Sequence, residues 1–133
     1  MKVKKIYLTG QLYYQAKTEK WLVSLSYYVY LSYLFPQKKF SVKQYMEKNK
    51  KHHDKTLYKH LNILTLKGLC VKNNETYTLV SNDTLKSMYR NNAEIKKGIK
   101  AKFKLFISNE NVLRDINRIK YFLKTIPLIS NLY

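Results

Sequence analysis

The sequence predicts a mainly α-helical protein with one small β-hairpin. Glycine and proline occur only three and two times in 133 residues, which favours long helices. Apolar residues recur at helical spacing in several stretches, and two β-like runs flank a turn sequence near the middle of the chain. The length fits one compact domain, or one domain with a short appendage.

The chain begins with a predicted extended segment, residues 3–14, interrupted by Gly10. An uncharged run follows from Trp21 to Gln37, with Thr18 as the expected helix N-cap and Pro36 as the stop. At about 17 residues this run is at the lower limit for spanning a bilayer. Because it contains three serines and four tyrosines, we expect a buried core helix and no membrane segment.

Two helices joined by a basic turn are predicted next. Ser41 is a suitable cap for a short helix over residues 42–49, with Tyr45 and Met46 facing inward. Asp54 is the expected cap of a longer helix, whose inward positions Leu57, Leu61 and Leu64 are spaced by one turn.

The second of these helices is expected to end at Lys67-Gly68, since glycine is common just past a helix C-terminus. Residues 69–71 and 77–80 are then short β-like runs, and residues 72–75 between them have the composition of a turn. We therefore expect a hairpin, in which Cys70 is a small core residue.

The rest of the chain is predicted to be mostly helical, with Ser81-Asn82-Asp83 capping a helix over residues 84–90. Within residues 92–107 a helical stripe competes with the alternating pattern of residues 100–105, which suits a strand; we favour the helix. After a Ser108-Asn109 cap, apolar residues follow a 4-3-4-3 spacing typical of a coiled-coil seam: Val112, Ile116, Ile119, Leu123 and Ile126. Two heptads are short, so this helix either packs on its own domain or forms a homodimer through residues 110–126.

The formal net charge is +18, from 26 Lys and Arg against 8 Asp and Glu, and 23 of the 26 cations are lysine. Such an excess indicates a polyanionic partner, nucleic acid first and an anionic membrane surface second. The lysine bias suggests an AT-rich genome. The single cysteine and the absence of a signal-peptide pattern lead us to expect a protein in the cytoplasm of a bacterial or archaeal host cell.

Residues 54–69, DKTLYKHLNILTLKGL, followed by the expected hairpin, resemble the recognition helix and wing of winged helix-turn-helix DNA-binding proteins of the small transcription-regulator type. The resemblance covers about half of the chain. It implies a winged-helix domain with an N-terminal extension over residues 1–81 and a C-terminal helical extension over residues 82–133. The implied function is transcription regulation by binding double-stranded DNA, in a phage, plasmid or other mobile element.

If the leucines face the core, the other side of the recognition helix is free to enter the major groove. The preceding basic turn and the wing tip are expected to hold the DNA backbone. The hairpin carries only one cation at its tip together with Glu75, so its contact is the weakest part of the resemblance. The predicted DNA-binding residues are Lys43, Lys48, Lys50, Lys51, His53, Lys55, Thr56, Tyr58, Lys59, Asn62, Lys72 and Asn73.

We expect no enzyme, cofactor or metal site, because the eight acidic residues form no close pair and no phosphate loop or nucleophile motif occurs. His60 is expected to pack or hydrogen-bond, and histidine protonation to strengthen anion binding below about pH 6.5. Two alternatives stay open. The chain could be a winged-helix component of a replication or nucleoprotein complex, or an inhibitor of a nucleic-acid-handling enzyme, binding a protein partner or nucleic acid non-specifically. It could also bind single strands or RNA through exposed tyrosines such as Tyr58, Tyr89 and Tyr121.

Overall fold

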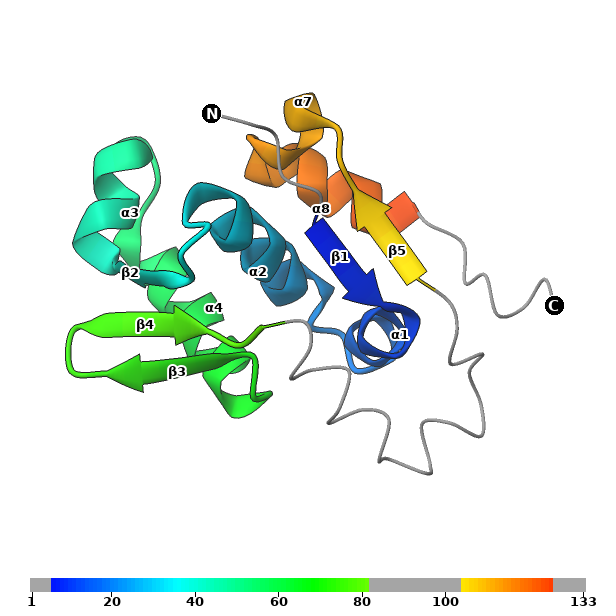
Figure 1. The fold of residues 1–133 in the computed structure, drawn as a ribbon, viewed down its shortest axis with the longest axis horizontal. Helices are drawn as coiled ribbons and strands as arrows, with labels where there is room; N and C mark the ends of the chain where they lie inside the picture. Colours follow the sequence, from blue (N-terminus) through cyan, green and yellow to red (C-terminus); the bar gives the residue numbers. More distant parts are fainter. Residues whose placement is uncertain (1–5, 82–103, 126–133) are drawn as a thin grey trace, which may run out of the picture.

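The computed structural model describes residues 6–81 and 104–125, and within them the protein is mixed α with two small antiparallel sheets (Figure 1). One sheet has three strands in the order β2-β4-β3, and the other pairs β1 with β5. In chain order the elements are β1 (Ile6–Thr9), α1 (Gly10–Thr18), α2 (Leu22–Leu34), β2 (Lys39–Ser41), α3 (Val42–Lys48), α4 (Asp54–Leu66), β3 (Cys70–Asn73), β4 (Thr76–Leu79), β5 (Lys104–Ile107), α7 (Glu110–Leu113) and α8 (Ile116–Thr125).

The N-terminal segment differs from the sequence prediction in two respects. It is extended only to Thr9, because α1 begins at Gly10 and buries Leu12, Tyr13 and Ala16 on one helical face. Thr18 does not cap the next helix. It is the last residue of α1, and its hydroxyl donates a hydrogen bond back to the Tyr14 carbonyl at 2.9 Å, as threonine often does inside a helix.

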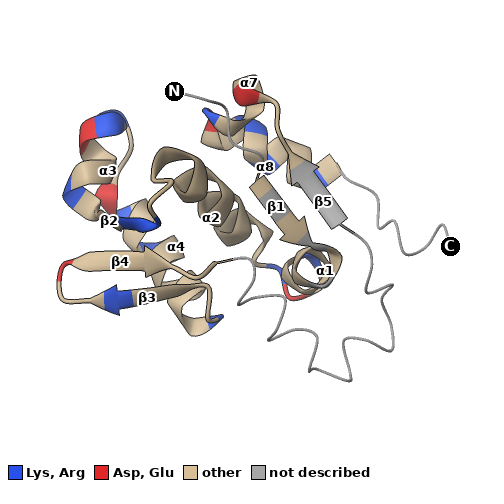
Figure 2. Ribbon diagram, viewed as in Figure 1, with Lys and Arg blue, Asp and Glu red and all other residues tan. Residues whose placement is uncertain are grey.

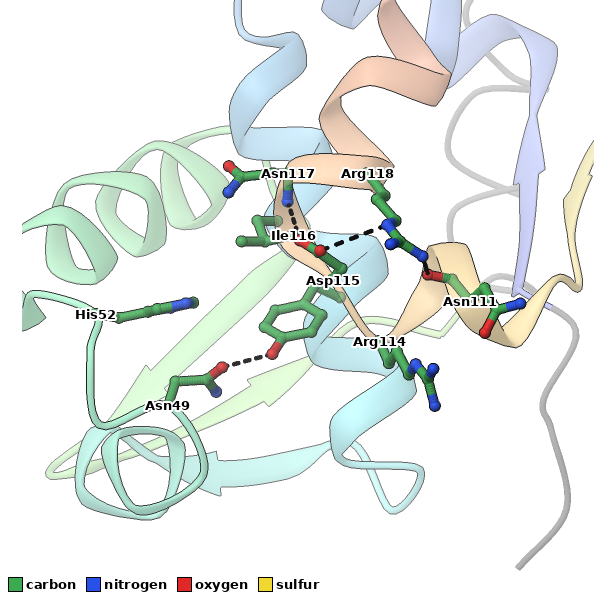
Figure 3. Close-up of a pocket in the computed structure, with 9 residues that line it drawn as sticks. Asn49, His52, Asn111, Arg114, Asp115, Ile116, Asn117 and Arg118 are labelled. Atoms are coloured by element: carbon green, nitrogen blue, oxygen red, sulfur yellow. Dashed lines mark hydrogen bonds and ion pairs between the residues drawn. The ribbon is translucent and has the colours of Figure 1, made fainter.

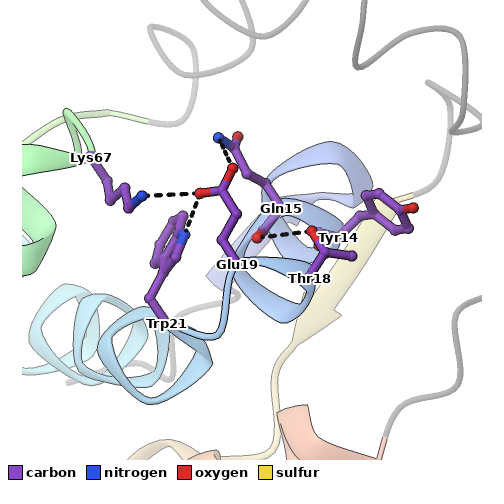
Figure 4. A network of polar contacts seen from close by, with 6 residues as sticks. All are labelled: Tyr14, Gln15, Thr18, Glu19, Trp21 and Lys67. Atoms are coloured by element: carbon purple, nitrogen blue, oxygen red, sulfur yellow. Dashed lines mark hydrogen bonds and ion pairs between the residues drawn. The ribbon is translucent and has the colours of Figure 1, made fainter.

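Glu19 connects the junction of α1 and α2 to the end of α4. Its carboxylate accepts hydrogen bonds from Lys67 Nζ at 3.0 Å, Trp21 Nε1 at 3.0 Å and Gln15 Nε2 at 3.2 Å (Figure 4). These contacts, led by Lys67 and then Trp21, lower the pKa of the Glu19 carboxyl. The carboxylate thereby links three elements at the protein surface.

Lys20, in the tight turn after α1, has a left-handed backbone conformation with φ 67°. The Trp21 amide closes this turn by donating to the Ala16 carbonyl at 2.9 Å, which leaves Lys20 at a position where glycine is the usual residue. A left-handed conformation costs a residue with a Cβ about 1–2 kcal/mol. We expect Lys20→Gly to raise the free energy of unfolding by about 0.5–1 kcal/mol in urea denaturation, the flexibility of glycine in the unfolded chain offsetting part of the gain. Unchanged or lower stability would contradict this account.

Helix α2 forms the centre of the core, as the sequence predicts. Leu25, Val29 and Leu31 are fully buried, and α4 and α8 both pack against this helix. Tyr28 reaches the three-stranded sheet by donating a hydrogen bond to the Val80 carbonyl at 2.6 Å. Nowhere in the described parts of the chain does a helix reach the length and apolarity needed to cross a bilayer.

The two helices after α2 lie where the sequence predicts them, except that the N-cap of α4 is one residue earlier than expected. Ser41 and Gln44 form a capping box at the start of α3, and Tyr45 is buried. The N-cap of α4 is His53 instead of Asp54, and no side chain caps this helix. Asp54 is one residue further along, in the first turn, where a carboxylate favours the positive end of the helix dipole.

The hairpin is confirmed, with strands slightly displaced from the predicted ones. Gly68 ends α4 with φ 83°, and Asn74 occupies the tight turn between β3 and β4 with φ 58°. Cys70 is buried, as expected. The sequence did not indicate β2, which pairs with β4 through Phe40 and Tyr77 and makes β4 the central strand.

The prediction of a helix over residues 92–107 is wrong for the last four of these residues. Residues 104–107 form β5, which pairs antiparallel with β1 so that Ile6 lies opposite Ile107. Both isoleucines are buried, which explains why the alternating pattern prevails here. Residues 92–103 and the helix predicted for 84–90 lie outside the described residues.

The C-terminal apolar seam packs within the chain's own domain. Asn109 caps α7 as predicted, but Arg114 and Asp115 separate α7 from α8, so the seam is not one continuous helix. Ile116, Ile119 and Leu123 are buried, and α8 packs on α2. A dimer would therefore need surfaces other than these three side chains; Ile126 lies outside the described residues.

Candidate nucleic-acid interface

Helix α4 has a buried and an exposed face, divided as the leucine spacing predicts. Leu57, Leu61 and Leu64 are buried together with His60. The side chains predicted to contact DNA are all on the exposed face: Lys55, Thr56, Tyr58, Lys59 and Asn62. This face carries two cations, two hydroxyl groups and an amide, and the only acidic residue in the helix is Asp54.

The turn between α3 and α4 adds cations next to the start of that face. Lys48, Lys50, Lys51 and His53 are exposed, and so is Lys43 on α3. Figure 2 shows blue segments on α3 and on β2, the edge strand of the three-stranded sheet. Two exposed acidic residues adjoin these cations, Glu47 on α3 and Asp54 at the start of α4. The turn therefore extends the positive surface beyond α4 itself.

The hairpin contributes less. Lys72 and Asn73 are exposed at the end of β3, but Glu75 in the turn is exposed as well. The ammonium group of Lys72 lies 5.9 Å from the centre of the Tyr77 ring, across the β3–β4 pair. The tip consequently presents one cation and one carboxylate, the weak point that the sequence already indicated.

His60 is a packing and hydrogen-bonding residue, as expected, rather than part of the exposed face. Its Nδ1 lies 2.8 Å from Ser24 Oγ, and its ring stacks on Tyr27 with centroids 4.6 Å apart. Burial, reinforced by the charges of Lys59 and Lys120, lowers the pKa of His60 to about 4. The ring is therefore neutral near pH 6.

The expectation that histidine protonation strengthens anion binding below about pH 6.5 thus fails for His60, and for His52 the shift opposes it. His52 Nδ1 lies 2.7 Å from the Tyr45 hydroxyl, and burial together with the Lys120 charge lowers the pKa of His52 below its ordinary value. Of the three histidines only His53 is exposed. Among the residues described, no three His, Cys, Asp or Glu side chains gather where they could hold a metal ion. Burial raises the pKa of the Cys70 thiol to about 11, so this thiol is protonated at neutral pH.

Lys120 on α8 is a cation close to the candidate site that the sequence did not predict to be there. Its charge acts on both His52 and His60, which places it near the α3–α4 turn and the inner side of α4. The inward positions 116, 119 and 123 do leave residue 120 off the buried seam. What the sequence does not indicate is that α8 folds back onto α2, the helix on which α4 also packs.

A polar cavity of about 350 Å³ lies between the α3–α4 turn and the start of α8 (Figure 3). On the turn side, Asn49 accepts a hydrogen bond from the Tyr30 hydroxyl at 2.5 Å. On the α8 side, Arg118 contacts the Asp115 carboxylate at 3.6 Å and donates to the Asn111 carbonyl at 3.2 Å. Asp115 partly neutralises Arg118, and Arg114 adds a second cation to the lining of this cavity.

No protein-family model, curated protein or solved structure matches this chain.

Proposed function

We propose that this protein is a winged-helix protein that binds double-stranded DNA by inserting α4 into the major groove, and that it regulates transcription in a phage, plasmid or other mobile element. The observation that carries the proposal is the α4 face, on which Lys55, Thr56, Tyr58, Lys59 and Asn62 are all exposed. An α-helix fits the major groove, where lysine pairs with guanine and asparagine with adenine.

The order of elements supports this proposal. Helices α2, α3 and α4 are followed by the β3–β4 hairpin, the sequence of elements that the resemblance implies, with β2 added beside β4. The buried leucines hold α4 against the core through one face only, so the opposite face is free for a ligand.

Charge gives a second line of support. A net charge of +18 favours a polyanion, and the exposed lysines of the α3–α4 turn would neutralise phosphates next to the start of the inserted helix. In this arrangement α4 reads bases and the turn positions the helix on the backbone.

The proposal is tested by fluorescence anisotropy with a labelled 30-bp duplex, single-stranded DNA and RNA over a salt series. We expect the protein to prefer the duplex even near physiological salt. Unlabelled random DNA should displace the labelled duplex only poorly. Equal binding to all three, lost steeply as salt rises, would mean that counterion release alone accounts for the affinity, and would refute sequence reading.

Asn62→Ala is expected to relax base preference at one position of the site, by about tenfold, because a bidentate amide–adenine contact accounts for about 1–3 kcal/mol. Preference is measured by competition between duplexes that differ at single base pairs. Asn111→Ala removes another exposed amide, on α7, and serves as the control. Unchanged preference in the Asn62 variant would contradict the assigned role.

A further inference from the structure

A second cavity, of about 490 Å³, lies between α2 and α8, and α4 contributes none of the described residues that line it. Its apolar lining comes from Leu22, Val23 and Tyr121. Val23 is 42% exposed and Tyr121 is 70% exposed, although they belong to α2 and α8, two helices that supply core residues. The groove therefore offers apolar surface that the described residues leave uncovered.

The polar lining of this groove is basic. Lys20, Lys120 and Lys124 line it, and no carboxylate of the described residues does. Apolar surface edged by lysines suits a ligand that presents apolar side chains flanked by acidic ones. A second copy of this chain is a poor fit, because it would bring another net charge of +18 towards the three lysines.

The backbone at Lys20 is a separate observation on the same groove. This residue is in a left-handed conformation that glycine would adopt without a steric penalty. The lysine nevertheless adds one of the three cations that line the groove. A binding role for the charge would account for a lysine at a position where the backbone favours glycine.

We propose that the groove between α2 and α8 docks an acidic, amphipathic helix of a partner protein. Apolar side chains of that helix pack on Leu22, Val23 and Tyr121, and its carboxylates pair with Lys20 and Lys124 at the rim and with Lys120. Nucleic acid is the poorer occupant, because an apolar floor gives its phosphates no partner. This proposal does not depend on DNA binding, since it uses α2 and α8 and not the outer face of α4.

The test measures binding of a fluorescein-labelled peptide about four turns long, with leucine at i, i+3, i+4 and i+7 and with glutamate and alanine elsewhere. A peptide of the same composition, with its leucines distributed over all faces, is the reference. The variants are Lys20→Glu with Lys124→Glu, and Tyr121→Ala. Their matched controls are Lys55→Glu with Lys59→Glu, which makes the same change in charge on α4, and Leu66→Ala, which truncates an apolar side chain that is 84% exposed outside the groove.

We expect the amphipathic peptide to bind at least about tenfold more tightly than its scrambled reference, and each groove variant to weaken it about tenfold, equivalent to 1.4 kcal/mol. The controls should change its affinity by less than about twofold. Equal binding of the two peptides, or equal losses in groove and α4 variants, would overturn the proposal, since bulk charge would then explain the affinity. Tighter binding to vesicles of anionic lipid, lost in Tyr121→Ala, would also overturn it and identify a membrane surface as the occupant.

Lys20→Gly supplies a readout that a purely structural role would not produce. It should raise the urea midpoint of unfolding, because the left-handed turn is no longer strained. It should also weaken peptide binding, because one cation of the groove is lost. A stabilised variant with unchanged peptide affinity would remove Lys20 from the site. Both proposals predict that the α4 double variant loses DNA binding and keeps peptide binding. Retained DNA binding in this variant would count against the proposed function alone, and lost peptide binding against the groove alone.

Discussion

Reversing the charge of Lys55 and Lys59 together is expected to weaken binding to duplex DNA by about a hundredfold at moderate salt. Both side chains are exposed on the outer face of α4, where each replacement removes a cation and places a carboxylate against phosphate or a base edge. About tenfold per site corresponds to 1.4 kcal/mol for each lysine. If both contact phosphate, the slope of log affinity against log salt should also fall by roughly two. Anisotropy titrations at several salt concentrations measure both quantities.

The control for this experiment is Lys20→Glu with Lys124→Glu, on the groove between α2 and α8. Each substitution changes the charge by two units, so both double variants go from +18 to +14. The control should lose only a few-fold in affinity, through the weaker overall field. A similar loss in both double variants would mean that net charge, not the α4 face, determines DNA binding. Circular dichroism checks that each variant is folded.

His60 is expected to make the folded protein less stable as the pH falls from about 6.5 to about 4. In the unfolded chain the ring binds a proton near its ordinary pKa of 6.5, whereas in the folded protein the pKa is lowered to about 4. The unfolded state therefore gains the proton first, so stability is complete above pH 6.5 and decreases below it. Two and a half pKa units correspond to about 3 kcal/mol of unfolding free energy.

Urea denaturation at pH 7 and pH 4, on the protein and on His60→Phe, tests this expectation. The phenyl ring retains the stack on Tyr27 but does not titrate, so the loss on acidification should be smaller by about 3 kcal/mol. His53→Phe introduces the same phenyl ring at an exposed position and controls for the substitution itself. Following the His60 ring protons by NMR needs no variant, and a pKa near 6.5 would contradict the buried, hydrogen-bonded position.

The sequence predicted the elements whose signals are local. Leucines one turn apart and a terminal glycine define α4, and Ser41 with Gln44 supplies the start of α3 within four residues. The exposed face of α4 follows from the same periodicity, because fixing the buried positions fixes the others. For this reason the five candidate DNA-binding residues on α4 could be named in advance.

Elements that depend on distant pairing could not be predicted in this way. β1 and β5 pair Ile6 with Ile107, across about a hundred residues, and β2 is three residues long and acquires its strand geometry from β4. Threonine is a common N-cap residue, yet Thr18 is the last residue of α1, because the buried apolar face of α1 continues the helix to this position. Local propensity gave way to tertiary packing in each case.

The same distinction applies to the binding surfaces. Lys120 joins the surroundings of His52 and His60 because α8 folds back onto α2, and the groove exists only where these two helices meet. Neither follows from residue spacing. The left-handed backbone of Lys20 likewise becomes visible only in three dimensions.

The most direct test of the central proposal is dimethyl sulfate protection on a duplex that the protein itself selects from a random pool. The reagent methylates guanine N7 in the major groove and adenine N3 in the minor groove, so one experiment distinguishes the two. If α4 inserts as proposed, a short run of guanine N7 positions is protected, and Lys55→Glu with Lys59→Glu abolishes that protection. A pool that yields no preferred sequence, or protection confined to adenine N3, would contradict major-groove reading by α4.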